Sequence, residues 1–275
     1  MQKLTVRKWI QRLARCGRMS FTKEEIREQL PDMPFLTLNA ALHRACRMRL
    51  IASAWRGFYV ILPPEYQDAG MLPVSEYIDK LMRYLGRPYC VSLLNAAAFY
   101  GAAHQRPMTF TVMTSEPAPR NSDKQTNFLR FISKSRVRQG FPDALVRRIK
   151  TQYSSMLISS PEFTACSLVQ YTKASGGLSH VLTVLDELTE SCRFDRLPKE
   201  LYDYVPTPVL QRLGYLLDSL LNRQTESGQL YDFISKSPDK TRRTKLDPAL
   251  PLSGDCYAPG WKICVNTHPE NDLDD

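Results

Sequence analysis

The sequence lacks the apolar stretches that would tie it to a membrane. No hydrophobic run approaches the length of a membrane span, and the first residues lack the apolar core of a signal peptide. The seven cysteines stand far apart and form no CxxC pair, which predicts neither a disulfide framework nor a zinc site. We therefore expect a cytoplasmic protein with no membrane contact, no metal and no cofactor, whose cysteines are small buried thiols.

The sequence also lacks a recognisable catalytic constellation. It contains no P-loop, GxSxG or HExxH motif. His104 and His180 have no evident Cys or Ser partner, and single histidines are usually structural. Asp79-Lys80 and Asp239-Lys240 do not sit on strands with an upstream acid, so a nuclease interpretation is weak. We expect no catalytic residues and no enzymatic activity.

Positive charge, by contrast, is abundant and unevenly distributed. Residues 1–64 hold 12 Lys and Arg against four Asp and Glu, a net charge of +8, and residues 124–150 hold eight against one, a net charge of +7. Since the whole chain carries +9, the remainder carries −6. Two basic blocks on a mildly acidic body indicate a polyanionic partner, although charges that merely solvate helices give the same composition. For residues 1–64 we favour nucleic acid, because the local fold signals agree with it.

A short helix that ends near Met48 is the centre of this prediction. At about 100° per residue, Leu42 and Ala45 fall near Leu38 and form an apolar face for a core. Thr37 is the expected N-cap. A helix with one face for a core and one basic face for a partner suits reading of a DNA groove. The opposite face holds Ala40, His43, Arg44 and Arg47.

A hairpin and two further helices surround that helix in the sequence. Residues 51–55 and 58–62 are β-prone runs separated by Arg56-Gly57, which predicts a hairpin turn. Thr22 and Glu25 have the spacing of a capping box and open a second helix. Another amphipathic helix precedes it. Together they predict an N-terminal winged helix-turn-helix over residues 1–64. Its expected DNA-binding residues are Thr37, Asn39, Ala40, His43, Arg44, Arg47 and Arg56, with an ordinary surface histidine as the alternative for His43.

The rest of the chain predicts a larger mixed α+β domain over residues 65–225, because helices, strands and helices follow one another. Residues 226–275 form a C-terminal extension with a short helix and a final strand. The expected helices begin near Pro73 and span 92–103, 161–174, 178–190, 206–221 and 228–236; the expected strands span 108–114, 127–133, 154–159 and 261–265.

A possible second basic surface lies in this domain. Three of its positive residues alternate with other residues, so an extended chain would place all three on one side. Two interpretations are open. The positive charge could protect a solvated sheet edge, or it could contact a protein or nucleic acid. The residues are Lys134, Arg136, Arg138, Arg147, Arg148 and Lys150.

A series of short fragments, in order along the chain, resembles the AbiEi family of antitoxins from bacterial abortive-infection (type IV) toxin–antitoxin systems. Each fragment is weakly specific, and the number and order of the fragments carry the resemblance. The polar segment 222–258 departs from it. The fragments are Phe21-Thr-Lys-Glu-Glu25, Arg56-Gly-Phe-Tyr-Val60, Leu93-Leu-Asn-Ala-Ala-Ala98, Ser160-Pro-Glu-Phe-Thr164, Gly176-Gly177, Gln211-Arg-Leu-Gly-Tyr-Leu-Leu-Asp218 and Trp261 to Asn266.

The resemblance implies two activities in phage defence. The N-terminal winged helix would bind inverted repeats in the promoter of its own operon and repress it. The C-terminal domain would counteract a cognate AbiEii-type nucleotidyltransferase toxin, with direct contact between the two proteins left open. The protein would be a monomer in solution or a dimer on DNA. The alternatives are a ligand-sensing transcriptional regulator without antitoxin activity, and a nucleic-acid enzyme with a winged-helix targeting module.

Overall fold

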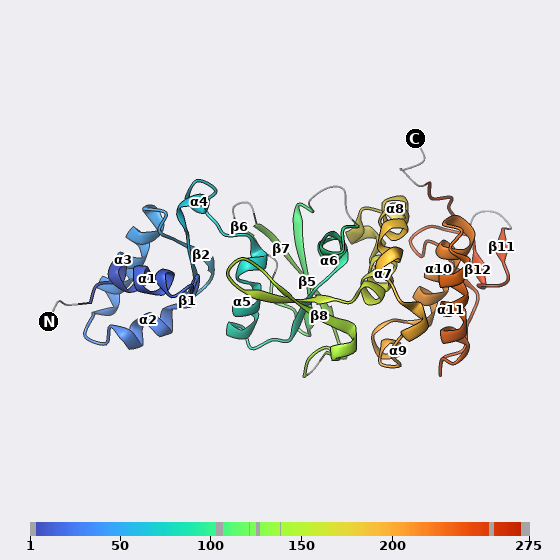
Figure 1. Ribbon diagram of the computed structural model, residues 1–275, viewed down its shortest axis with the longest axis horizontal. Coiled ribbons are helices and arrows are strands. Elements are labelled where there is room, and N and C mark those ends of the chain that lie inside the picture. The colour runs from blue at the N-terminus through green and yellow to red at the C-terminus, as the bar shows by residue number, and fades with distance from the viewer. Residues whose placement is uncertain are drawn as a thin grey trace. The chain divides into compact units, whose positions relative to one another are not determined.

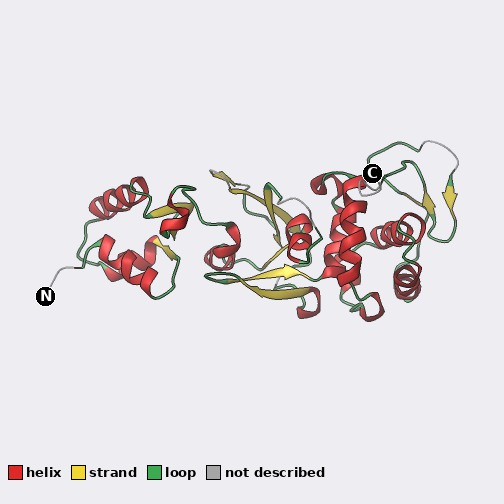
Figure 2. Cartoon of the chain, turned by 45° about the horizontal axis from the view of Figure 1, so that its top comes forward, coloured by secondary structure: helices red, strands yellow, loops and turns green. Residues whose placement is uncertain are grey.

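The structure is a computed structural model, and it describes residues 4–102, 107–120, 122–124, 127–137, 139–252 and 256–270. Helices and strands are mixed along the chain (Figures 1 and 2), so the expected α+β class is confirmed. The chain divides into two compact units. The first comprises residues 1–89, 108–133 and 148–157, and the second comprises residues 90–107, 134–147 and 158–275.

The first unit begins with three helices and a three-stranded antiparallel sheet, which we call the N-terminal module (residues 4–62). The sheet has the order β1-β3-β2. The helices and the hairpin match the sequence prediction, and β1, which pairs with β3, is an addition. The elements are α1 (Val6–Arg15), β1 (Ser20–Thr22), α2 (Lys23–Gln29), α3 (Phe35–Arg47), β2 (Ile51–Trp55) and β3 (Phe58–Ile61).

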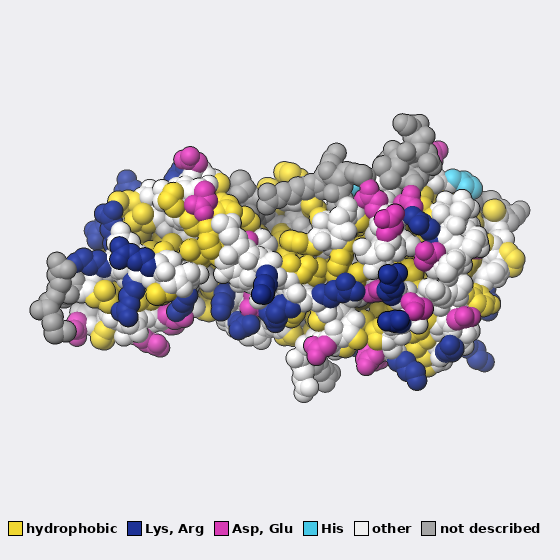
Figure 3. All heavy atoms as spheres, in the orientation of Figure 1, with side chains coloured by type: hydrophobic (Ala, Val, Ile, Leu, Met, Phe, Trp, Pro, Cys, Tyr) yellow, Lys and Arg dark blue, Asp and Glu magenta, His cyan; other side chains and the backbone are white. Residues whose placement is uncertain are grey.

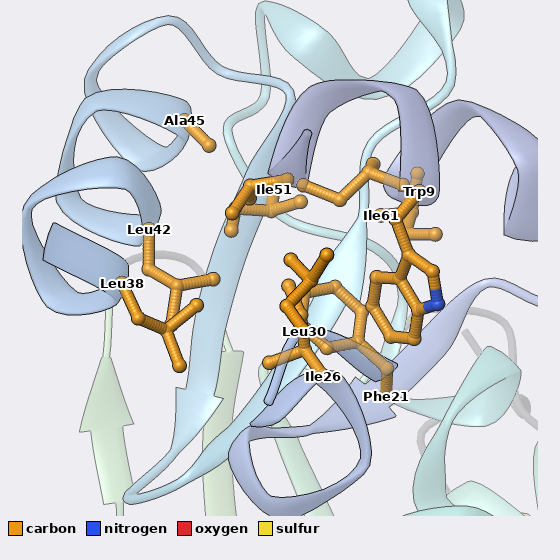
Figure 4. Close-up of a cluster of buried hydrophobic side chains, with 11 residues drawn as sticks. Trp9, Phe21, Ile26, Leu30, Leu38, Leu42, Ala45, Ile51 and Ile61 are labelled. Carbon is orange, nitrogen blue, oxygen red and sulfur yellow. The ribbon is translucent and has the colours of Figure 1, made fainter. Parts of the chain in front are cut away.

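The module has its own hydrophobic core (Figure 4). Leu38 and Leu42 point from α3 into a cluster that also receives Ile26 from α2. The ring of Trp9 meets Phe21 edge-on at a centroid distance of 5.0 Å. The predicted apolar face of α3 is therefore the buried one. Burial of an aliphatic side chain of this size stabilises a fold by about 1.5–3 kcal/mol, so these residues fix the orientation of α3 on the module.

The ends of the module's elements follow from local chemistry. The capping box of α2 is present, because the Glu25 amide donates to Thr22 Oγ1 and the Thr22 amide donates to the Glu25 carboxylate. The β2–β3 turn passes through Gly57 at φ +77°, a left-handed conformation that favours glycine. A methyl group there would also lie 2.5 Å from the hydroxyl of Tyr84.

The start of α3 corrects one prediction. The helix begins at Phe35 with Pro34 as its N-cap, and it has no side-chain cap. Thr37 is therefore an exposed residue of the first turn and not the cap. Met33 and Leu38 have the spacing of a hydrophobic staple around Pro34; Leu38 belongs to the core cluster and Met33 packs against it. This earlier start adds Leu36 to the helix.

Beyond the module, the chain contributes a six-stranded sheet of order β6-β7-β5-β4-β9-β8 within the described residues. β6 and β7 pair antiparallel, and β4 and β9 pair in parallel. The three strands predicted between residues 108 and 159 are confirmed as β5, β7 and β9. The elements are α4 (Pro64–Gln67), the 3₁₀ turn Val74–Glu76, α5 (Ile78–Tyr84), β4 (Tyr89–Val91), β5 (Thr109–Ser115), β6 (Ser122–Lys124), β7 (Asn127–Lys134), β8 (Val146–Lys150) and β9 (Ser155–Ser159).

Helices dominate the second unit, where α7 packs against α6, α8 and α10. The C-terminal extension is anchored by Trp261, whose ring lies so close to Gly214 that a methyl group there would approach it to 2.0 Å. Among the described residues, none of the helices combines the length and the hydrophobicity that a membrane span requires. The elements are α6 (Leu93–Phe99), α7 (Pro161–Gln170), α8 (Leu178–Leu188), α9 (Leu201–Tyr204), α10 (Thr207–Tyr215), the π-helical turn Leu216–Leu220, α11 (Gln224–Ser235), β10 (Thr244–Lys245), β11 (Tyr257–Ala258) and β12 (Ile263–Cys264).

Candidate nucleic-acid interface

The outer face of α3 carries most of the residues that the sequence proposes for DNA binding. Its core face holds Leu38, Leu42 and Ala45, which are 1%, 2% and 6% exposed. At about 100° per residue, the side opposite Leu38 is centred near Arg47. Asn39 is half-buried at the margin of the face. The exposed predicted residues are Thr37, Ala40, His43, Arg44 and Arg47.

The positive side chains of this face form no ion pairs among the described residues. Within the described residues, no carboxylate forms an ion pair with His43, Arg44 or Arg47. Other arginines of the module do have internal partners. Arg18 makes a 2.8 Å ion pair with Glu25, and Arg49 donates to two carbonyl oxygens at the end of α4 at 3.0 Å each. The charges on α3 are therefore available to an external anion.

Helix α1 extends the positive surface. It packs against α3 and exposes Arg7, Arg12 and Arg15, while Val6 and Trp9 are buried. Figure 3 shows Lys and Arg side chains gathered over the helices of the N-terminal module. Two adjacent helices thus present positive charge, which is the electrostatic requirement for a phosphate backbone.

The predicted wing-tip residue is held by its backbone. The carbonyl oxygen of Arg56 accepts a hydrogen bond of 3.1 Å from the hydroxyl of Tyr84, while the Arg56 side chain is exposed. Beside the turn, the ring of Trp55 meets Phe131 edge-on at 6.1 Å, so Trp55 is a packing residue. Contacts with α5 and β7 therefore fix the turn within the first unit. The guanidinium of Arg56 is exposed and can contact a ligand.

Leu36 is the residue that sequence reasoning missed. It lies in the first turn of α3, on the side opposite Leu38, and is 80% exposed. The expectation that Thr37 caps the helix placed Leu36 outside it. The staple spacing of Met33 and Leu38 around Pro34 was the available signal. Phe35 beside it is 54% exposed, so α3 begins with two exposed large apolar side chains.

The second basic surface is not assembled as the alternation suggests. β7 ends at Lys134, and the chain turns directly after it. Lys134 is only 8% exposed; its Nζ donates to Gln170 Oε1 at 2.8 Å and to the carbonyl oxygen of Tyr204 at 3.1 Å. Burial lowers the pKa of Lys134 to about 8. The amine of Lys134 is therefore hydrogen-bonded inside the second unit and is not exposed to an external partner.

Most other members of this block also have contacts within the protein. Exposed Arg136 pairs with Asp203. The guanidinium of Arg147 lies 5.8 Å from the ring centroid of Tyr100. Lys150 is exposed. Arg138 lies outside the described residues. Burial therefore removes Lys134 from such a surface, whereas Arg136, Arg147, Arg148 and Lys150 are exposed.

Arg148 is tied to a buried carboxylate. Its NH1 lies 3.7 Å from Asp79 Oδ1, while Arg83 lies 2.9 Å from Oδ2 and the Tyr89 hydroxyl donates to Oδ1 at 3.0 Å. Asp79 is 5% exposed, so these partners satisfy a charge that burial would otherwise make costly. Arg148 and Lys150 stand on β8, which is an edge of the six-stranded sheet. This arrangement fits the interpretation of positive charge at a sheet edge.

The described residues offer little for catalysis or metal binding. Among them, no group of three His, Cys, Asp or Glu side chains could hold a metal ion. His180 packs beside Gly176, where a methyl group would lie 2.9 Å from its ring, and His104 lies outside the described residues. Cys90, Cys166 and Cys192 are buried, and burial raises the pKa of each thiol. Cys16 and Cys256 are exposed, so the expectation of buried thiols is wrong for those two.

Comparison with known proteins identifies a domain in the middle of the chain. Residues 89–219 match the family model of the AbiEi antitoxin C-terminal domain. The match confirms the resemblance to AbiEi antitoxins that the sequence fragments predict, and it covers the strand β4, helices α6 to α10 and the strands between them. The AbiEi antitoxin family is not an enzyme family. No curated protein matches the sequence.

A solved structure shows the same overall fold. The crystal structure of the RV2827C protein from Mycobacterium tuberculosis is similar to this chain with a TM-score of 0.64 and 18% sequence identity. The similarity covers 93% of this chain and 89% of the other. It therefore includes most of the residues outside the family match, and it concerns the fold alone.

Proposed function

We propose that the protein is the antitoxin of a type IV, abortive-infection toxin–antitoxin system, because residues 89–219 match the AbiEi antitoxin C-terminal domain. Residues 1–64 form a winged helix-turn-helix that binds inverted repeats in the operon's own promoter and represses it. Residues 65–225 form the antitoxin domain, which counteracts an AbiEii-type nucleotidyltransferase toxin, and residues 226–275 extend it. The protein acts in the cytoplasm and contributes to phage defence.

The unpaired positive face of α3 carries the DNA-binding half of this proposal. Three helices and a hairpin in about 60 residues have the composition of a winged helix-turn-helix, and α3 is the third helix, directly before the hairpin, which supports its assignment as the recognition helix. Its core face is filled, so its outer face is free to enter a groove. Arg44 and Arg47 there reach base edges or phosphates, and Arg56 at the hairpin turn reaches the backbone or the minor groove.

Promoter binding is tested with the full-length protein and DNA from upstream of its operon. We expect preferential binding over a scrambled fragment of equal length, with two copies bound per inverted repeat. Fluorescence anisotropy measures the affinity, and analytical ultracentrifugation of the complex measures the stoichiometry. Equal affinity for both fragments would contradict sequence-specific repression.

The antitoxin half is supported by the family match and is tested separately. A full-length variant with Arg44→Ala and Arg47→Ala is expected to lose repression of a promoter reporter and to keep rescuing cells that express the neighbouring toxin gene. A matched variant with Arg136→Ala and Lys150→Ala removes the same charge elsewhere and should keep both activities. Failure of the wild type to rescue would contradict the antitoxin role, whatever the reporter shows.

A further inference from the structure

The outer face of α3 has two chemical halves. Its last turns present His43, Arg44 and Arg47, whereas its first turns present Leu36 and Ala40. At about 100° per residue, Leu36 lies about 160° and Ala40 about 200° from Leu38, so both stand near the centre of the outer face. An apolar patch therefore occupies the beginning of the helix, and a cationic patch occupies its end.

This division matches two parts of a DNA major groove. From Leu36 to Arg47 the helix advances about 16 Å, the length of roughly five base-pair steps. The first residues of a recognition helix are those that contact base edges. In the major groove, the apolar feature of a base pair is the C5-methyl group of thymine, and aliphatic side chains recognise it. Positive side chains about two to three turns after Leu36 then contact phosphate or guanine.

We propose that Leu36, supported by Ala40, forms an apolar contact with the C5-methyl group of a thymine in each half-site, and that this contact selects the base there. The inference rests on the proposed function, since it requires α3 to enter the major groove. The cations on the same face favour a polyanion as occupant over an apolar protein surface. Leu36 is therefore a specificity-determining residue, and Arg44 and Arg47 supply further affinity through the base edges or phosphates that they reach.

The test removes the methyl group from the DNA and the side chain from the protein. The upstream fragment is prepared by amplification with either dTTP or dUTP, because uracil pairs as thymine does and lacks only the C5-methyl group. We expect the wild type to bind the uracil fragment about three- to tenfold more weakly per bound copy, the value of one buried methyl contact. Leu36→Ala should weaken binding to the thymine fragment by a similar factor and bind both fragments alike.

Met48→Ala is the matched control. Met48 is the residue directly after α3, it is 57% exposed, and it stands about 280° from Leu38, away from the centre of the face. This variant should keep the wild-type ratio between the two fragments. Because Leu36 is 80% exposed, neither substitution should move the thermal unfolding midpoint by more than a degree or two.

The outcomes separate the inference from the function on which it rests. Equal binding of the two fragments by the wild type, or an unchanged thymine-to-uracil ratio in Leu36→Ala, overturns the thymine contact and leaves repression standing. A wild type that does not prefer the upstream fragment to scrambled DNA overturns both. A Leu36→Ala variant that binds both fragments normally but no longer rescues cells from the toxin assigns the side chain to a protein partner and overturns the proposal.

Discussion

Two segments of this chain carry nearly the same net charge, +8 over residues 1–64 and +7 over residues 124–150, yet they use it differently. On α3, His43, Arg44 and Arg47 lie exposed without a carboxylate partner among the described residues. In the second segment, Lys134 is buried and hydrogen-bonded and Arg148 is paired with buried Asp79. Charge counted along a sequence does not show which charges are buried or paired within the fold.

The largest expected effect comes from the free charges. A contact between an arginine and a base edge is worth roughly 1–3 kcal/mol, so Arg44→Ala with Arg47→Ala should weaken promoter binding by about 30-fold or more when both arginines reach bases. The unfolding free energy should change by less than about 0.5 kcal/mol, because both side chains are exposed. Anisotropy titration and urea unfolding measure the two quantities. Wild-type affinity in the double variant would remove α3 as the recognition helix.

The buried lysine should respond to pH rather than to DNA. The pKa of Lys134 is about 8 in the folded protein and about 10.4 in an unfolded chain. Between these values the unfolded state binds the extra proton, so folding stability rises with pH. The unfolding free energy of the wild type should therefore increase by roughly 2–3 kcal/mol relative to Lys134→Met from pH 8 to 10.

Comparison with Lys134→Met isolates this effect, because other tyrosine and cysteine titrations are common to both proteins. Urea unfolding at pH 7, 8, 9 and 10 gives the difference directly. At pH 7 the promoter affinity of Lys134→Met should equal that of the wild type. A difference in unfolding free energy that does not vary with pH would show that burial does not lower the pKa of Lys134.

A smaller effect is expected at the buried carboxylate. Arg148→Ala removes one of three partners of Asp79, and the Arg83 and Tyr89 contacts persist. Because Arg148 is itself half exposed, the loss of stability should be about 1 kcal/mol. Thermal unfolding measures it, and promoter affinity should not change. A loss of DNA binding equal to that of the α3 variant would erase the contrast between the two segments.

The smallest effect is expected for an exposed pair. Arg136 and Asp203 form an ion pair whose two side chains are 64% and 60% exposed. Such pairs contribute about 0–1 kcal/mol, so Arg136→Ala should be nearly neutral in both unfolding and promoter binding. A clear loss of toxin rescue in this variant would instead place Arg136 on a partner surface.

Much of the N-terminal module could be predicted because its signals are local. The capping box at Thr22, the turn at Gly57 and the apolar period through Leu38 and Leu42 each depend on neighbouring residues. The start of α3 was misplaced because Thr37 is a good cap by residue type, whereas the backbone is set by Pro34. Because of that error, Leu36 was not predicted to lie in the helix.

The second unit was harder to predict for a physical reason. Alternation along residues 134–138 cannot reveal that β7 ends at Lys134 or that Gln170 and Tyr204, distant in sequence, surround its amine. The strand β8 was missed because Arg147 and Arg148 interrupt the expected alternation. Burial of a charge depends on tertiary contacts, and a single sequence does not contain them explicitly.

The central claim is that the free charges on α3, and not those near Lys134, neutralise DNA phosphates. The salt dependence of promoter affinity tests it most directly. Relative to the wild type, Arg44→Ala with Arg47→Ala should reduce the slope of log affinity against log salt concentration by about two per bound copy. Arg136→Ala with Lys150→Ala should leave the slope unchanged. Equal slopes for the α3 variant and the wild type, or a reduced slope only in the second variant, would contradict the account.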